Sequence, residues 1–154
     1  MRYGYFMMPM HPPGSFLADT LDMDLRQIER LEQLGYEEAW IGEHHSGGWE
    51  TIADPMVFIA AAAERTRHIR LGTGVSSLPY HHPLLLADRL VLLDHLTRGR
   101  AMFGVGPGQL TSDARMLGIE PNEQRRMMEE SLDVIVARLR GETVNRTTDW
   151  FRIV

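Results

Sequence analysis

Short apolar stretches recur along this chain roughly every thirty residues, and this repeat is the feature that most limits how it can fold. The stretches begin near Tyr3, Ala39, Arg70 and Ala101, so successive starts are 36, 31 and 31 residues apart. Helical patterns of apolar residues separate them. A strand followed by a helix at this interval is typical of βα units, whose strands pair in a parallel sheet. The repeat predicts an α/β fold, either an open doubly wound sheet or half of an eight-stranded barrel.

The helical segments carry recognisable start and stop residues. Asp54-Pro55 combines a capping oxygen with a proline at the first helical position, and a glycine follows three of the helical patterns. The helices over 54–66 and 83–96 are too apolar to face water on every side, so we expect them to form the interface of a homo-oligomer, namely a dimer. For the small residues from Ala60 to Ala63, a plainly buried helix face is an equally good account. We expect helices over 21–34, 54–66, 83–96 and 128–139, with a broken helical stretch over 112–117.

Composition disfavours several classes of protein. The 154 residues are 44% hydrophobic and 24% charged, which fits one globular domain. A net charge of −5 without a basic stripe argues against nucleic-acid binding, and the lack of cysteine excludes disulfides and thiolate chemistry. No apolar run reaches the roughly 18 residues of a membrane helix, and the N-terminus lacks a signal-peptide pattern. We therefore expect a cytoplasmic protein that does not engage a membrane.

Histidines gather in the loops after the predicted strands, where parallel α/β proteins place their chemistry. Five of the seven histidines lie there, namely His11, His44, His45, His81 and His82. Histidine suits proton transfer near neutral pH. A metal site is a weaker interpretation, because neighbouring strand residues point to opposite faces and no H-x-H or H-E-x-x-H spacing occurs. We predict no metal ion.

Glycines end the third and fourth predicted strands. Gly104, Gly106 and Gly108 alternate with other residues but match neither the dinucleotide fingerprint nor the P-loop. A tight turn is the simplest explanation for this run. Gly72 and Gly74 allow either the close approach of a flat ligand or an unusual backbone conformation.

Three segments in chain order carry a family resemblance. They are Trp40-Ile41-Gly42-Glu43-His44-His45, Arg70-Leu71-Gly72-Thr73-Gly74-Val75 and Gly99-Arg100-Ala101-Met102-Phe103-Gly104-Val105-Gly106. With them the chain resembles the bacterial-luciferase-like flavin monooxygenase family from Met1 to about Arg140. Within that family the residues from Gly106 to Gly118 are most similar to the limonene-monooxygenase-like branch.

The resemblance implies the N-terminal half of a TIM-type (β/α)8 barrel, as a single partial domain over 1–154 with four βα units. It also implies reduced FMN supplied by a separate flavin reductase. Oxygen adds to this flavin, and the peroxyflavin oxidises a small organic substrate. His44 matches the family's catalytic histidine, which acts as an acid and base. The cofactor-binding residues implied are Glu43, Gly74, Val75, Ser76, Gly106, Pro107 and Gly108.

The resemblance implies more specific roles for Glu43 and for Gly74-Val75. The chain also differs from the family pattern in two respects, at Pro107 and in its length. Glu43 is implied to support the backbone of the third strand, and Gly74-Val75 stands where the family often has a non-proline cis peptide bond against the flavin. Pro107 stands where luciferase-type members often have an arginine for the flavin phosphate. A whole barrel needs about 250 residues. We therefore expect a fragment of a larger enzyme, or a half-barrel that pairs with another chain.

Two other interpretations stay open. The chain is also compatible with an F420-dependent oxidoreductase of the same superfamily, in which His44 assists hydride transfer. From a different class, a half-barrel without catalytic activity would bind flavin or a partner subunit without turnover.

Overall fold

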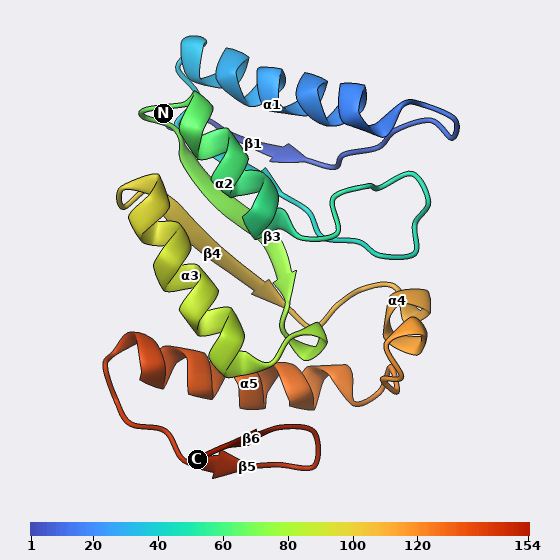
Figure 1. The fold of residues 1–154 in the computed structure, drawn as a ribbon, viewed down its shortest axis with the longest axis vertical. Helices are drawn as coiled ribbons and strands as arrows, with labels where there is room; N and C mark the ends of the chain where they lie inside the picture. Colours follow the sequence, from blue (N-terminus) through green and yellow to red (C-terminus); the bar gives the residue numbers. More distant parts are fainter.

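The computed structural model describes residues 1–154 and contains a four-stranded parallel sheet (Figure 1). Each strand pairs in parallel with the next one along the chain, so the order across the sheet is that of the sequence. The predicted parallel βα repeat is confirmed. The strands are β1 Gly4–Met7, β2 Glu38–Ile41, β3 Arg70–Ser77 and β4 Ala101–Gly106.

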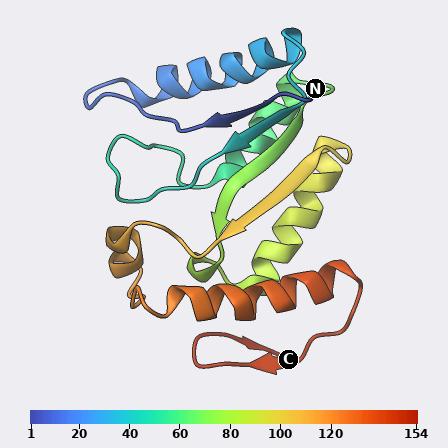
Figure 2. The ribbon, with the colours of Figure 1, turned by 180° about the vertical axis from the view of Figure 1, so that it is seen from behind.

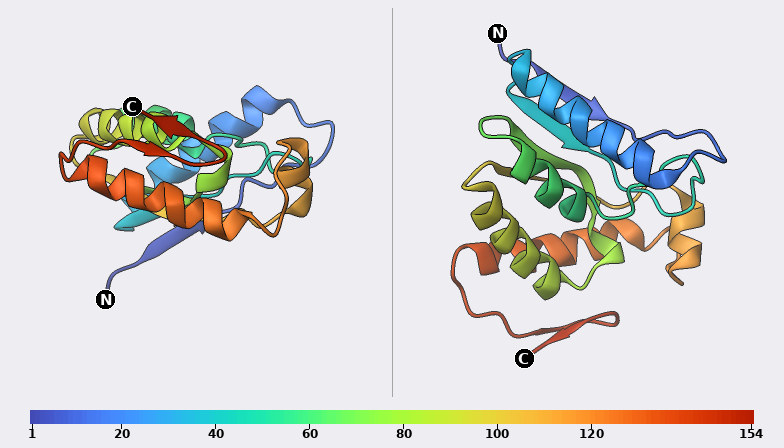
Figure 3. Two further views of the ribbon diagram at one scale, coloured as in Figure 1. Left: turned by 90° about the horizontal axis from the view of Figure 1, so that it is seen from below. Right: turned by 45° about the horizontal axis from the view of Figure 1, so that its top comes forward.

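Helices cover one face of this sheet, and the C-terminal elements lie beyond β4 (Figures 1 and 3). The covering helices are α1 Leu17–Gln33, α2 Pro55–Arg65 and α3 Pro83–Thr97, the last preceded by the 3-10 turn η1 Leu78–Tyr80. The chain then forms α4 Thr111–Met116, α5 Gln124–Leu139, β5 Arg146–Thr147 and β6 Arg152–Ile153. α5 packs against α3 and η1, and β5 and β6 form an antiparallel pair that the sequence patterns did not predict.

The ends of the helices follow local chemistry. The Asp54 carboxylate accepts hydrogen bonds from the backbone nitrogens of Met56 at 2.9 Å and Val57 at 3.3 Å, as the predicted cap requires. α1 begins at Leu17 rather than at the expected residue 21; Leu17 lies four residues before Leu21 and so extends the same helical spacing by one turn. No helix combines the length and the apolar character needed to cross a bilayer.

The two faces of the sheet differ. Ala39, Ile41 and Leu71 are fully buried beneath the helices. On the other face, seen in Figure 2 without a covering helix, Phe6 is 54% exposed and Trp40 lies over Gly72. A Cβ atom on Gly72 would lie 2.6 Å from the Trp40 ring, so glycine lets this indole lie flat on the sheet.

Candidate functional site

A cavity of about 350 Å³ lies at the carboxyl ends of the four strands, and residues from each strand or the loop after it form its wall. Parallel strands bring their carboxyl ends to one edge of a sheet, so residues about thirty positions apart meet there. Seven of the eight predicted site residues line this cavity. They are Glu43, His44, Gly74, Val75, Gly106, Pro107 and Gly108.

Ser76 is the predicted residue that does not line the cavity. It is 1% exposed, whereas Ser77, one residue later, contributes to the wall. The pairing of β3 with β4 shifts register between Thr73 and Ser76, and such an irregularity changes which residues share a face. The peptide bond between Gly74 and Val75 in this stretch is cis, as the resemblance implied.

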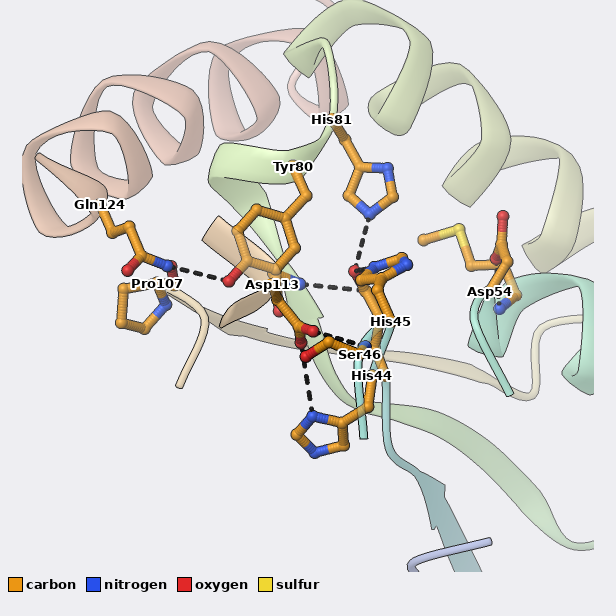
Figure 4. A network of polar contacts seen from close by, with 12 residues as sticks. His44, His45, Ser46, Asp54, Tyr80, His81, Pro107, Asp113 and Gln124 are labelled. Carbon is orange, nitrogen blue, oxygen red and sulfur yellow. Dashed lines mark hydrogen bonds and ion pairs between the residues drawn. The ribbon is translucent and has the colours of Figure 1, made fainter. Parts of the chain in front are cut away.

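Glu43 is the buried centre of a polar cluster beneath the cavity, and its side chain has no exposed surface. Its Oε1 lies 3.1 Å from Nε2 of His45 and 3.2 Å from Nε2 of His81. Its Oε2 accepts a hydrogen bond of 3.1 Å from the backbone nitrogen of Ser77. Figure 4 shows the neighbouring His81 and His45. Glu43 thus ties the end of β3 to the loop after β2.

His44 lies between two carboxylates. Its Nδ1 is 3.6 Å from Oδ2 of Asp113, and its Nε2 is 3.4 Å from Oε2 of Glu50. The ring is 17% exposed, and Nδ1 is buried without a hydrogen-bond partner. An unpaired buried polar atom costs on the order of 1–3 kcal/mol, so its persistence beside a cavity calls for a functional reason.

Asp113 reaches this cluster from α4 (Figure 4). Its Oδ1 accepts a hydrogen bond of 2.7 Å from the backbone nitrogen of Ser46. Burial by itself raises the pKa of the Asp113 carboxyl, but the hydrogen bonds from Ser46 and His45 outweigh it and hold the pKa below its usual range. Asp113 is therefore an ionised carboxylate facing His44.

Gly108 has a left-handed backbone conformation and no room for a Cβ atom unless its neighbours shift. Its φ is +87°, and a Cβ atom there would overlap the Tyr80 hydroxyl and lie 2.6 Å from Nε2 of Gln124. Nε2 of Gln124 donates to the Tyr80 hydroxyl at 2.9 Å and to the Pro107 carbonyl at 2.8 Å (Figure 4). The glycine turn after β4 is thereby held against η1 and α5.

Burial and the nearby charge of Asp113 raise the pKa of Tyr80. Its hydroxyl consequently stays protonated near neutral pH and is available to donate a hydrogen bond.

The wall is suited to a flat aromatic ligand such as a flavin ring. The backbone of Gly74 and Gly106 forms part of it without side chains, and Phe6, Val75 and Val105 add apolar surface. At Gly106 a Cβ atom would lie 2.7 Å from a methyl carbon of Val75. No lysine or arginine lines the cavity, so these residues fit the ring of FMN but offer no cation for its phosphate.

Sequence reasoning assigned no role to four residues of this site, namely Glu50, Asp113, Tyr80 and Gln124. Glu50 and Asp113 both lie in segments that follow strands, β2 and β4 respectively. In parallel α/β proteins, functional residues lie in the segments after the strands, and this is the signal that indicated His44. The same signal could have indicated both carboxylates, because they lie only a few residues further along such segments.

The family described as luciferase-like monooxygenase matches residues 1–153. The chain belongs to this family. It is 58% identical over 149 residues to limonene 1,2-monooxygenase of Rhodococcus erythropolis, covering 97% of this chain and 38% of that protein. It is 57% identical over 154 residues to 4-hydroxyprotoasukamycin monooxygenase of Streptomyces nodosus subsp. asukaensis, covering 99% of this chain and 42% of that one.

Among solved structures, this luciferase-like chain is similar to the oxygenating constituent of 3,6-diketocamphane monooxygenase from Pseudomonas putida, a type II Baeyer-Villiger monooxygenase in complex with FMN. The TM-score is 0.93 at 28% identity, covering 99% of this chain and 43% of that one. The chain spans about two fifths of the length of these relatives and matches their N-terminal half. Its four βα units are half of a TIM-type barrel, as predicted.

Proposed function

We propose that this chain forms the flavin-ring side of a monooxygenase that uses reduced FMN and O2 to oxidise a small organic substrate. The observation that carries the proposal is His44, held between two carboxylates on a glycine-rich cavity wall. Bound reduced FMN supplies the electrons and the site at which oxygen is activated. The relatives are monooxygenases of small organic molecules, which supports the same reaction class.

His44 is the acid and base in this proposal. Its ring lines the cavity, so one side faces the space that ligand occupies. A proton held there is available to the reacting oxygen atoms and can be taken back after the substrate is oxidised. The mostly buried ring is fixed by its neighbours, which lowers the entropic cost of orienting it.

Glu43 and the glycine turn after β4 prepare the surface on which the ring binds. Glu43 holds the end of β3 through the Ser77 nitrogen, and Gln124 holds the turn through the Pro107 carbonyl. Both anchors fix backbone rather than side chains, which suits the recognition of a planar ring. FMN is favoured over F420, because the structural relative with the TM-score of 0.93 contains FMN.

Two partners belong to the proposal. A separate flavin reductase supplies reduced FMN, as the family resemblance implies. A second copy of the protein covers the outer face of α2 and α3, where large apolar side chains are exposed. These are Val57 at 67%, Leu85 at 58%, Leu92 at 59% and Leu96 at 48% exposure.

The test uses the full-length protein with His44 replaced by glutamine. We expect turnover of a cyclic alkene or cyclic ketone, supplied with reduced FMN and O2, to fall at least about 100-fold, because general acid–base groups contribute about 10²–10⁴. FMN affinity, measured by fluorescence titration, changes little because the ring-binding backbone is intact. Product is quantified by gas chromatography.

His68→Gln is the matched control, because His68 is exposed at the opposite edge of the sheet, before β3. It keeps normal turnover. Full activity of His44→Gln contradicts the assignment of His44, and binding of F420 in place of FMN contradicts the cofactor. Sedimentation of the protein at micromolar concentration as a monomer contradicts the proposed α2–α3 interface.

A further inference from the structure

We propose that Asp113 and Glu50 are positioning residues for His44, with Asp113 holding the proton on Nδ1 and Glu50 facing Nε2. This inference rests on the proposed function, because it explains how the acid–base residue is oriented. It concerns two carboxylates that contact His44 from different segments: Asp113 from α4 and Glu50 from the loop after β2.

Nδ1 of His44 faces the Asp113 carboxylate. This atom is buried and makes no hydrogen bond, and Oδ2 of Asp113 faces it at 3.6 Å. A carboxylate accepts hydrogen bonds and donates none, so it favours the form of the ring that carries a proton on Nδ1. Distances at such pairs are often long before ligand binds and shorten in the complex.

Asp113 is itself held in place by the segment that carries His44. Its Oδ1 accepts from the backbone nitrogen of Ser46, two residues after His44, at 2.7 Å. The hydroxyl groups of Ser46 and Ser112 also lie 2.6 Å apart. α4 is thus fastened to the segment that carries His44, and the side chain of Asp113 is 2% exposed. The orientation of the imidazole therefore depends on how α4 docks.

Nε2 of His44 faces the second carboxylate, that of Glu50. Oε2 of Glu50 lies 3.4 Å from it, and the Glu50 side chain is 14% exposed. Glu50 also lies close to Gly47, where a Cβ atom would sit 3.0 Å from the same oxygen. Asp113 is the more buried of the two carboxylates, 2% exposed against 14%, so it keeps the proton on Nδ1 of the neutral ring. The proton that His44 exchanges is then the one on Nε2, and Glu50 orients that side of the ring by accepting from Nε2 when His44 is protonated.

Replacing Asp113 by asparagine tests its contact with Nδ1 through the position of one proton. The amide oxygen of the new side chain keeps the bond from the Ser46 nitrogen, so its NH2 group faces Nδ1 of His44. The NH2 group donates where Oδ2 of Asp113 accepted. The neutral ring therefore carries its proton on Nε2 instead of Nδ1. The same change of aspartate to asparagine in the Ser-His-Asp triad of serine proteases leaves the geometry intact while producing the wrong tautomer.

The experiment is nitrogen NMR of the full-length protein with 15N-labelled histidine rings, with His44 assigned by its loss in His44→Gln. In the wild type we expect the neutral His44 to carry its proton on Nδ1. In Asp113→Asn the Nδ1 and Nε2 shifts exchange their protonated and unprotonated character. In Glu50→Gln the Nδ1 proton remains, and only the Nε2 shift changes.

Turnover provides the second readout. Asp113→Asn lowers kcat about 100-fold and Glu50→Gln about tenfold, while KM and FMN affinity change less than about threefold. Asp133→Asn is the control, because its carboxyl is 71% exposed and pairs with Arg146 on the far side of α5. It leaves both readouts unchanged.

The two carboxylates are tested separately. An unchanged His44 tautomer in Asp113→Asn overturns the role of Asp113, and an unchanged Nε2 shift in Glu50→Gln overturns that of Glu50. If Asp113→Asn does not fold, Glu50→Gln and the wild-type tautomer still test the inference. If His44→Gln retains activity while the tautomer exchange occurs, the proposed function fails and the positioning contact stands.

Discussion

The two edges of the sheet are both polar, yet they are built in opposite ways. At the amino-terminal edge, Arg100 donates to the carbonyls of Thr97, Ile69 and Ala63 and to both oxygens of Thr66, at 2.9 to 3.4 Å. At the carboxyl-terminal edge, His44 has a buried ring nitrogen without a partner. The first edge pairs its polar groups within the protein, whereas the second carries a histidine whose Nδ1 makes no hydrogen bond and only faces the Asp113 carboxylate.

Glu32 repeats the pattern of the first edge. Its carboxylate accepts hydrogen bonds from the backbone nitrogens of Arg67, His68 and Ile69, at 2.6 to 3.2 Å. These contacts fasten the end of α1 to the start of β3. The amino-terminal edge therefore stabilises the fold, whereas the carboxyl-terminal edge carries the candidate site, which is the division found in TIM barrels.

The largest expected effect on stability comes from Arg100→Ala. It removes a charged donor from several buried carbonyls, so we expect the free energy of unfolding to fall by about 3 kcal/mol. FMN affinity of the folded protein stays unchanged, because Arg100 lies at the other edge. Urea denaturation and FMN titration measure the two quantities. Arg125→Ala, at an exposed position of α5 without an ion pair, is the control. If Arg100→Ala lost FMN affinity but kept its stability, the division of roles between the two edges of the sheet would be wrong.

The second largest effect is expected for Gly108→Ala, and comparison with Gly118→Ala separates the cost of backbone strain from the cost of close packing. Gly108→Ala places a Cβ against Tyr80 and Gln124 at a φ of +87°, so we expect a loss of about 2 kcal/mol and at least about tenfold weaker FMN binding. Gly118→Ala has a similar φ of +72° but open space around its Cβ. It costs about 1 kcal/mol and leaves FMN binding intact. Equal losses of FMN affinity in both variants would contradict this account.

The smallest expected effect is the pH dependence of the stability that Glu32 contributes. Burial by itself raises the pKa of Glu32, but the backbone donors of Ile69, His68 and Arg67 outweigh it and lower the pKa below its ordinary 4.5. A lowered carboxyl pKa gives stability that is present above about pH 4.5 and is lost as pH falls through the folded pKa. Glu32→Gln therefore loses about 1 kcal/mol at pH 7 and much less near pH 3. Thermal unfolding at both pH values checks this, and an equal loss at both would refute it.

Much of this architecture was predictable because it is local in the chain. The βα repeat, the Asp54 cap and the polar ends of the strands are properties of neighbouring residues, which determine strand and helix directly. The parallel arrangement then places Glu43, Gly74 and Gly106 at one edge. Family resemblance added what periodicity left open, namely that the four units are half of a barrel.

Other parts were decided by tertiary structure alone. Ser77 lines the cavity and Ser76 does not, because the register of β3 against β4 shifts within the strand. The β5–β6 pair formed where Phe151 and Ile153 pack against Val134 of α5, a contact between tail residues and a helix earlier in the chain. No local pattern contains such information.

The same distinction holds at His44. By itself the sequence determined that a histidine stands at the end of a buried strand, because alternation and turn residues encode strand ends locally. Only the tertiary structure decided which groups face each ring nitrogen. Asp113 meets His44 because β4 and α4 return to the same edge, and hydrogen bonds across that gap depend on docking geometry rather than on sequence spacing.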